Sequence, residues 1–175
     1  MERPLSQGIR VRVLFLEDAG FYCAGGTTLR EDIVIAKIRK NAASEIWVVA
    51  KGYAEKRTCD VREYFHPADS PEWLPTKKGV SIPLELLAQT IDAVEEMAGR
   101  KTVGQVCELP RGNKAKMRFA ICEYQNHTYA EVRIYYNNGA SDDDWKPGKG
   151  VTVPLAMLIP LVEALRLAED ATASC

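Results

Sequence analysis

The sequence predicts an α+β fold of two tandem β-β-β-β-α units, each a four-stranded antiparallel sheet with a C-terminal helix, packed together as an intrachain pseudo-dimer. One reason is a repeat, in which a small strand, a proline and a helix occur twice, 71 residues apart. A second is the alternation of polar and apolar residues in three segments before each motif, which indicates strands. A third is the apolar period of three to four residues after each proline, which indicates helices. The repeated residues are Gly79, Val80, Pro83, Leu84 and Leu87, which recur as Gly150, Val151, Pro154, Leu155 and Leu158.

Composition restricts the class of protein. The 175 residues are 46% apolar, which is enough for a packed core without metals or disulfides. The five cysteines include no Cys-x-x-Cys pair, so we expect free thiols in a reducing compartment. Pro154 and Pro160 break the longest apolar runs well short of a membrane span. We therefore expect an intracellular protein that is not embedded in a membrane, in the cytoplasm or nucleoid if bacterial and in the nucleus if eukaryotic.

Residues 1–30 are predicted to form an N-terminal extension with one extra strand. The strand is expected at residues 9–16, where Val11 and Val13 alternate with arginines. A loop with Gly20, Gly25 and Gly26 follows, without the lysine and glycine spacing of phosphate-binding loops. We interpret that loop as a connection.

The first unit is assigned to residues 31–99 and the second to residues 100–175. Strands predicted in the first unit match strands in the second at the repeat offset, namely 32–39 with 103–110, 45–53 with 116–124, and 58–65 with 129–136. A short basic turn then leads to a fourth strand, at 151–153 in the second unit. Pro83 and Pro154 suit the first position of a helix, where no backbone donor is needed. Pro160 lies inside the second helix and predicts a kink there.

Strand parity predicts which side chains face the core. The apolar set comprises Val61 and Val132 together with Ile46, Val48, Ala50, Met117, Phe119 and Ile121. The first helix is expected to cover the inner face of its own sheet with Leu84, Leu87, Ile91, Val94 and Ala98. The second helix is apolar over a wider arc, so we expect it to pack on the first helix as well.

The opposite face carries cations between aromatic rings. Unpaired bases stack on such rings at ~1–3 kcal/mol per base, while lysine and arginine neutralise phosphates. Arginine and tyrosine are also ordinary cross-strand neighbours on an open sheet, which is the competing interpretation. A net charge of −1 argues against a general polyanion binder. The predicted strands are more basic than the whole, however, since residues 30–80 carry ten basic and eight acidic side chains.

Catalytic and metal motifs are poorly represented. His66 and His127 lie in predicted turns with no nucleophile at a recognisable spacing. The acidic run at residues 142–144 lacks the spaced ligands and the glycine of a calcium loop. No nucleotide or Gly-x-Ser-x-Gly motif is present. We expect no enzyme activity, no metal and no cofactor, and a thiol enzyme based on Cys23 is the weakest alternative.

Two segments resemble a known family. Val61-Arg62-Glu63-Tyr64-Phe65, followed by a turn and Gly79-Val80-Ser81-Ile82, resembles the C-terminal domain of the eukaryotic transcriptional coactivator positive cofactor four. The second copy resembles it through Val132-Arg133-Ile134-Tyr135-Tyr136 and Lys146-Pro147-Gly148-Lys149-Gly150. The resemblance covers about residues 31–169. It implies two sheets paired through their helices into a twofold body that binds single-stranded or melted DNA, as related whirly-like folds do.

The resemblance also implies site residues. The strand arginine is Arg62 or Arg133, and the aromatic residue after the tyrosine is Phe65 or Tyr136. By parity these two aromatics lie on the core side, so a strand end or bulge must bring them to a ligand. The family's stacking tryptophan is absent at that place in both copies, while Trp73 and Trp145 lie in the turns nearby. Together with the open face, the candidate nucleic-acid-binding residues are Lys37, Arg39, Trp47, Lys51, Tyr53, Arg62, Phe65, Lys77, Lys78, Arg118, Tyr124, Arg133, Tyr136, Trp145, Lys146 and Lys149.

The leading hypothesis is a non-enzymatic protein that binds single-stranded DNA, with RNA as an alternative ligand, in transcription regulation or genome maintenance. The transcription machinery is a further expected partner, and additional self-association is left open. The alternative is a protein–protein interaction module that keeps the fold but has reduced nucleic-acid binding.

Overall fold

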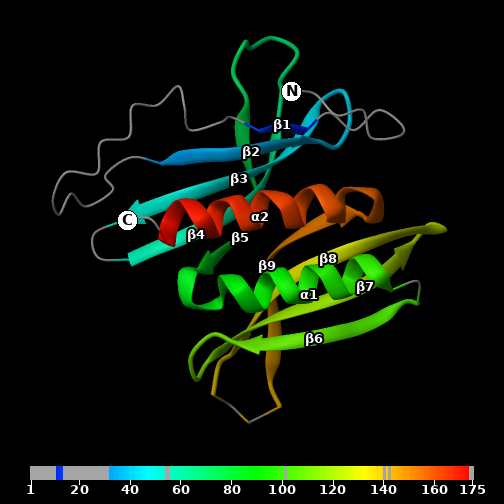
Figure 1. The fold of residues 1–175 in the computed structure, drawn as a ribbon. Helices are drawn as coiled ribbons and strands as arrows, with labels where there is room; N and C mark the ends of the chain where they lie inside the picture. The colour runs from blue at the N-terminus through cyan, green and yellow to red at the C-terminus, as the bar shows by residue number, and fades with distance from the viewer. Residues whose placement is uncertain are drawn as a thin grey trace, which may run out of the picture.

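The computed structural model describes residues 11–13, 32–53, 56–100, 102–139, 141 and 143–173, with only the backbone at residues 11–13, 53 and 173. Two antiparallel sheets lie next to each other, and two helices cover one side of both (Figure 1). The first sheet has the order β1 (Val11–Val13), β2 (Ile33–Arg39), β3 (Ser44–Tyr53), β4 (Lys56–Phe65) and β5 (Leu74–Pro83). The second has the order β6 (Gly104–Pro110), β7 (Ala115–Tyr124), β8 (His127–Asn137) and β9 (Trp145–Pro154). The helices are α1 (Leu87–Gly99) and α2 (Leu158–Ala173), each preceded by a 3₁₀ turn, Leu84–Leu86 and Leu155–Met157.

The predicted tandem fold is confirmed. Four antiparallel strands and a helix occur twice, and each predicted strand is found within a few residues of its expected position. The extra N-terminal strand is present as β1, which pairs with β2 and makes the first sheet five-stranded. The assignment of residues 1–30, 31–99 and 100–175 to separate parts stays a prediction.

The core lies between the sheets and the helices. All eight strand residues expected to face it are buried, and none is more than 4% exposed. Their burial stabilises the fold by roughly 1.5–3 kcal/mol for each large side chain, relative to leaving it in water. Alternation along the strands is therefore sufficient to place one face of each sheet.

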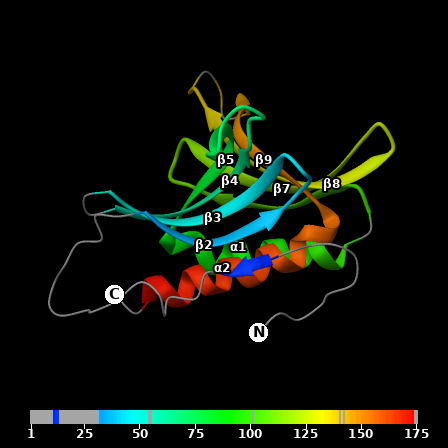
Figure 2. The ribbon, with the colours of Figure 1, turned by 90° about the horizontal axis from the view of Figure 1, so that it is seen from above.

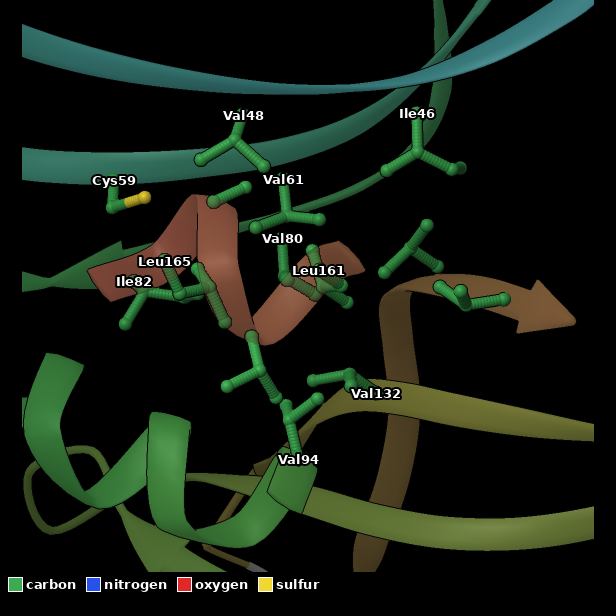
Figure 3. Packing of buried hydrophobic residues seen from close by; sticks show 14 of the residues in the cluster. Ile46, Val48, Cys59, Val61, Val80, Ile82, Val94, Val132, Leu161 and Leu165 are labelled. Carbon is green, nitrogen blue, oxygen red and sulfur yellow. The ribbon is translucent and has the colours of Figure 1, made fainter. Parts of the chain in front are cut away.

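Each helix packs on the sheet of the other unit, so the expectation that a helix covers its own sheet is wrong. α1 contacts β6 and β7, whereas α2 contacts β2 and β3. Figure 3 shows Leu161 and Leu165 of α2 beside Val61 of the first sheet, and Val94 of α1 beside Val132 of the second. The exchange is possible because β5 and β9 lie in contact where the sheets meet. A helix that follows either strand reaches the neighbouring sheet without a long connection.

The two helices also pack against each other, as expected from the wide apolar arc of α2. Because α1 contacts both α2 and a sheet, its buried face is wider than a single stripe. It includes Thr90, Ala93 and Met97, whereas Ala98, which was expected to be buried, is exposed.

The basic stretch expected to be a turn belongs to strands β5 and β9. Proline is tolerated there because both are edge strands, where a missing backbone N–H does not interrupt a ladder. Each strand has a bulge opposite one residue of its neighbour. Glu63 faces residues 76–78, and Ile134 faces residues 148–149. The lysines of this stretch therefore lie on bulged strands at fixed positions.

The three prolines at the helix starts are accommodated differently from the prediction. Pro83 and Pro154 end their strands and cap the 3₁₀ turns with extended ψ angles of 142° and 140°, so they precede the first helical position. Pro160 is the third residue of α2. An N–H in the first turn of a helix has no acceptor within that helix, so the hydrogen bond whose loss predicted a kink is not needed.

Candidate nucleic-acid interface

The side of the sheets away from the helices is called the open face. Figure 2 shows both helices on one side, while the connections from β4 to β5 and from β8 to β9 rise on the other. In Figure 1 these connections lie at opposite ends of the molecule. Each unit therefore presents its own open face and its own hairpin.

A stack of three side chains crosses the open face of the first sheet. Lys37 Nζ lies 3.9 Å from the centre of the Trp47 ring. The Tyr64 ring is parallel to Trp47 within 12°, with ring centres 4.0 Å apart. Since a ring has two faces, Lys37 and Tyr64 together occupy both faces of Trp47. A base can stack on Trp47 only by displacing one of them.

The second sheet has a stack at the equivalent positions with different chemistry. Arg118 Nε donates to Glu108 Oε1 at 2.8 Å, and its guanidinium carbon lies 4.2 Å from the centre of the Tyr135 ring. Lys116 also donates to Glu108, at 2.8 Å, and lies over the Trp145 ring. A planar guanidinium thus replaces the indole of the first unit, since both can stack on a tyrosine.

Ion pairing in this stack shifts the protonation equilibria. Burial raises the pKa of Glu108, but the hydrogen bonds from Lys116 and Arg118 outweigh it and leave that pKa below its usual value. The hydrogen bond to Glu108 raises the pKa of Arg118. Glu108 and Arg118 are therefore both charged at neutral pH, and the carboxylate offsets the charge of the guanidinium within the protein.

The strand arginines hold the bulges in place. Arg62 donates to both Asp60 carboxylate oxygens, at 2.9 and 3.1 Å, and to the carbonyl of Thr76 at 2.9 Å. Arg133 donates to Glu131 at 2.8 Å and to the carbonyl of Gly148 at 3.0 Å. Each arginine thus connects a carboxylate two residues earlier to the first bulge residue. Their hydrogen bonds make them positioning residues for the bulge.

The glycine of each Lys-Gly pair provides space for the arginine. A Cβ at Gly79 would lie 3.0 Å from the Arg62 side chain. A Cβ at Gly150 would lie 3.1 Å from Arg133 Cβ and 3.0 Å from the Val132 carbonyl. The repeated glycine is therefore explained by the side chain that crosses it.

Asp60 is the most buried charged group of the open face, with 1% of its side chain exposed. It accepts hydrogen bonds from Arg62 and from Ser81 Oγ at 2.7 Å, and Lys51 Nζ lies 3.7 Å away. Burial raises the pKa of Asp60, but these hydrogen bonds and charges lower it by more, so the pKa lies below its usual value. Asp60 is consequently ionised and neutralises most of the charge of Arg62.

The lysines of the bulges are the accessible cations. Lys77, Lys78 and Lys149 are exposed. Lys78 Nζ lies 3.9 Å from Glu63, and Lys146 Nζ lies 3.6 Å from Asp144. Within the described part of the chain, Lys77 and Lys149 form no ion pair. One lysine in each unit is thus available to a phosphate.

Two aromatic residues are accessible beside the bulges. Phe65 is 41% exposed and Tyr136 is 42% exposed. They lie past the bulges, opposite Leu74 and Lys146, so the strand-end position expected from parity is found. The Tyr136 ring packs on Gly148, where a Cβ would lie 2.4 Å from it.

The other candidate residues are dispersed. Arg39 is exposed and donates to two carbonyls of the β2–β3 turn, while Lys51 lies near Asp60 and Asp32. Tyr124 is 65% exposed at the end of β7, far along the strand from the bulge. The side chain of Tyr53 lies outside the described residues.

The sequence interpretation missed the carboxylates that neutralise the open face. Asp60-Val61-Arg62 and Glu131-Val132-Arg133 each place an acid and an arginine on the same face of a strand, because residues two apart point the same way. This spacing was available as a signal of ion pairing. The acid-x-arginine spacing distinguishes the two strand arginines, whose charges are paired within the protein, from the bulge lysines Lys77, Lys78 and Lys149, which have no acid two residues before them.

Alternative chemistries gain no support from the described residues. None of them form a group of three or more potential metal ligands, and no described helix is long and apolar enough to cross a membrane. Burial raises the pKa of Cys59 to about 12, and burial also raises the pKa values of Cys107 and Cys122. Cys23 lies outside the described residues.

Comparison with known proteins identifies the family. Residues 44–93, from β3 into α1, match the family model of Transcriptional Coactivator p15 (PC4), which is positive cofactor four. A PC4 homologue from Burkholderia pseudomallei in its orthorhombic crystal form is 32% identical, covering 43% of this chain and 100% of that chain, with a TM-score of 0.37. The tetragonal form gives 34% identity, 40% and 100% coverage, and a TM-score of 0.37. No curated protein matches. The family match, and the sequence identity over the full length of the homologue, show that this chain belongs to the PC4 family of transcriptional coactivators.

Proposed function

We propose that the protein binds single-stranded DNA, with RNA as an alternative ligand, and acts without catalysis in transcription regulation or genome maintenance. One observation carries the proposal. Each unit presents a lysine without an ion-pair partner among the described residues, Lys77 or Lys149, on a bulge beside an exposed aromatic, Phe65 or Tyr136. Membership of the PC4 family supports it, because single-stranded DNA binding is the activity that the family resemblance implies.

The bulge lysines and the exposed aromatic rings would contact different parts of a bound strand. The lysines neutralise phosphates, while the rings of Phe65 and Tyr136 stack on bases, which tolerates any sequence. Arg62 and Arg133 fix the bulges from which the lysines project. Because the backbone that carries these lysines is fixed before binding, little backbone ordering is needed when a strand binds.

Salt dependence tests the lysine contribution. We expect labelled oligo-dT of about 20 nucleotides to bind at low salt, and its log affinity to fall linearly with log salt, by ~0.7 per phosphate contact. Combining Lys77→Ala with Lys149→Ala should reduce that slope by about 1.4, since two contacts are lost. Lys56→Ala, at an exposed position at the start of β4, is the matched control and should leave the slope unchanged. Absence of wild-type binding at low salt would refute the proposed function.

Substitution of the rings tests stacking separately from charge. Combining Phe65→Leu with Tyr136→Leu keeps apolar side chains but removes both aromatic surfaces. Affinity should fall by ~1–3 kcal/mol for each base that stacks, with the salt slope unchanged because no charge is removed. An unchanged affinity would show that the rings are not contacted.

The second candidate function is a protein interaction module that keeps the fold with reduced nucleic-acid binding, and tight salt-dependent binding in the same titration would exclude it. It is favoured by one observation, that Asp60, Glu108 and Glu131 neutralise the arginines Arg62, Arg118 and Arg133 of the open face. In that case Arg133→Ala and Lys149→Ala leave nucleic-acid behaviour unchanged and a partner, such as a component of the transcription machinery, co-purifies. The proposed cellular setting is the cytoplasm or nucleoid of a bacterium, or the nucleus of a eukaryote, where such ligands occur.

A further inference from the structure

A hollow of about 340 Å³ lies where the first unit meets the second sheet. Its lining comprises Lys40, from the β2–β3 connection of the first unit, and Tyr124, Tyr129, Thr152 and Pro154 from β7, β8 and β9. The volume falls within the range of small-molecule sites, at the lower end of about 300–1,000 Å³. The hollow combines the two units, so neither unit alone contains it.

The walls of the hollow suit a nucleobase. Tyr129 and Pro154 are directly paired in the register of β8 and β9, and Thr152 points to the same face two residues before Pro154. Tyr124 is 65% exposed, so much of its ring is accessible at this site. The Tyr129 hydroxyl is protonated at neutral pH and can donate a hydrogen bond, as tyrosine ordinarily can, and burial raises its pKa further. The walls thus offer a stacking ring and hydroxyl groups.

Lys40, which lines the hollow, belongs to a cluster of charged groups with a net positive charge. Lys40 Nζ is 2.9 Å from Glu63 Oε2, and Lys78 Nζ is 3.9 Å from the same oxygen. Two ammonium groups therefore share one carboxylate. The remaining positive charge suits a phosphate next to a base held in the apolar part of the hollow.

The equivalent place on the first sheet has different residues. At the repeat offset of 71, Tyr129 corresponds to Thr58, and Glu63 corresponds to Ile134. The first sheet therefore lacks the tyrosine ring that forms one wall. The hollow described here is a feature that distinguishes the two halves.

We propose that this hollow is a nucleotide subsite, which stacks one base of a bound strand on Tyr129 and holds its phosphate at Lys40. The proposal rests on the proposed function and extends it to residues at the boundary between the units. In a protein with an exact twofold axis, a strand bound across the axis has the same free energy in either direction, because the rotation interchanges the two. A subsite in one half removes this equivalence and gives the strand a preferred direction.

Two variants of the full chain test the subsite by oligo-dT binding. Tyr129→Thr introduces the residue found at the equivalent position and should weaken binding about 5-fold or more through lost stacking. Thr58→Ala is the matched control on the first sheet and should bind within about 2-fold of wild type, because no stacking ring is removed. Lys40→Gln should reduce the salt slope by about 0.7. Thermal melting of each variant establishes that it is folded.

Photocrosslinking of the wild-type chain locates the base directly. Oligo-dT with one iododeoxyuridine near its 5′ end, or one near its 3′ end, is irradiated and the crosslinked peptide is identified by mass spectrometry. We expect Tyr129 or Tyr124 to be crosslinked predominantly from one end, and this measurement decides the matter if Tyr129→Thr does not fold. Wild-type binding with unaffected Tyr129→Thr and Lys40→Gln variants, or crosslinking outside the hollow, would overturn the subsite alone. Failure of wild type to bind at low salt overturns the proposed function as well.

Discussion

Asp60 and Glu131 occupy equivalent positions in the two units, yet their loss should have unequal effects. Asp60 is 1% exposed and Arg62 is 17% exposed. Glu131 is 17% exposed, Arg133 is 30% exposed, and one 2.8 Å hydrogen bond joins them. Removing one partner of a buried pair costs ~3–5 kcal/mol, because the other charge is left uncompensated. Since Arg62 keeps some contact with water, we expect Asp60→Ala to reduce the free energy of unfolding by about 3 kcal/mol, and Glu131→Ala by about 1 kcal/mol.

Urea denaturation at neutral pH measures both values, provided that the slope of the free energy with urea is unchanged. The exchanged helices connect both sheets, so we expect one cooperative transition for the whole chain. Equal losses for Asp60→Ala and Glu131→Ala would show that the greater burial of the Asp60–Arg62 pair does not make it more costly to break.

The pH dependence gives a second measurement on Asp60. Its pKa is below the usual value of 3.8, so the unfolded chain binds a proton at this group at higher pH than the folded chain. The stabilisation by ionised Asp60 is fully present above about pH 5 and is lost as the pH falls through the folded pKa. The stability difference between wild type and Asp60→Ala should therefore shrink in acid. A constant difference across this range would contradict the lowered pKa.

Three further predictions concern other parts of the molecule. Glu95→Arg and Arg166→Glu should each lower stability by about 0.5–1 kcal/mol and restore each other when combined, which a double-mutant cycle in urea measures; additive losses would contradict a direct pair. Gly148→Ala should displace the Tyr136 ring, since a Cβ would lie 2.4 Å from it, and so weaken oligo-dT binding with little change in melting temperature; intact affinity would contradict a role for that ring. Cys59, whose pKa burial raises to about 12, should resist iodoacetamide in the native chain and react in urea, as peptide mass spectrometry shows; rapid native labelling would contradict its burial.

The sequence could predict those parts of the fold that depend on local periodicity. Alternation placed Ile46 and Val48 in the core, and the repeat offset established two units. It could not predict which sheet each helix covers, because an amphipathic pattern defines an apolar surface and leaves its partner open. The position of β5 and β9 where the sheets meet decides this, and it is a property of the tertiary fold.

The residues of the candidate site could be predicted from the sequence, but the contacts among their side chains could not. The bulge lysines and exposed aromatics were expected, whereas Trp47 is enclosed between Lys37 and Tyr64. Cross-strand neighbours determine that enclosure, and they depend on the register of three strands. The hollow around Tyr129 was not expected, because it requires the two units to be brought together.

The contact between Glu95 and Arg166 explains what a tandem chain permits. These residues are 71 positions apart, which is the repeat offset, so equivalent positions of α1 and α2 meet across the pseudo-twofold axis. In a symmetric dimer such a contact joins a residue to its own copy, so a charged residue there would meet a like charge. Within one chain the two positions can carry opposite charges and attract. The same freedom allows Tyr129 to differ from Thr58. Differences between the two halves can therefore stabilise their contact, as at Glu95 and Arg166, and can also give a bound strand a preferred direction, as at Tyr129.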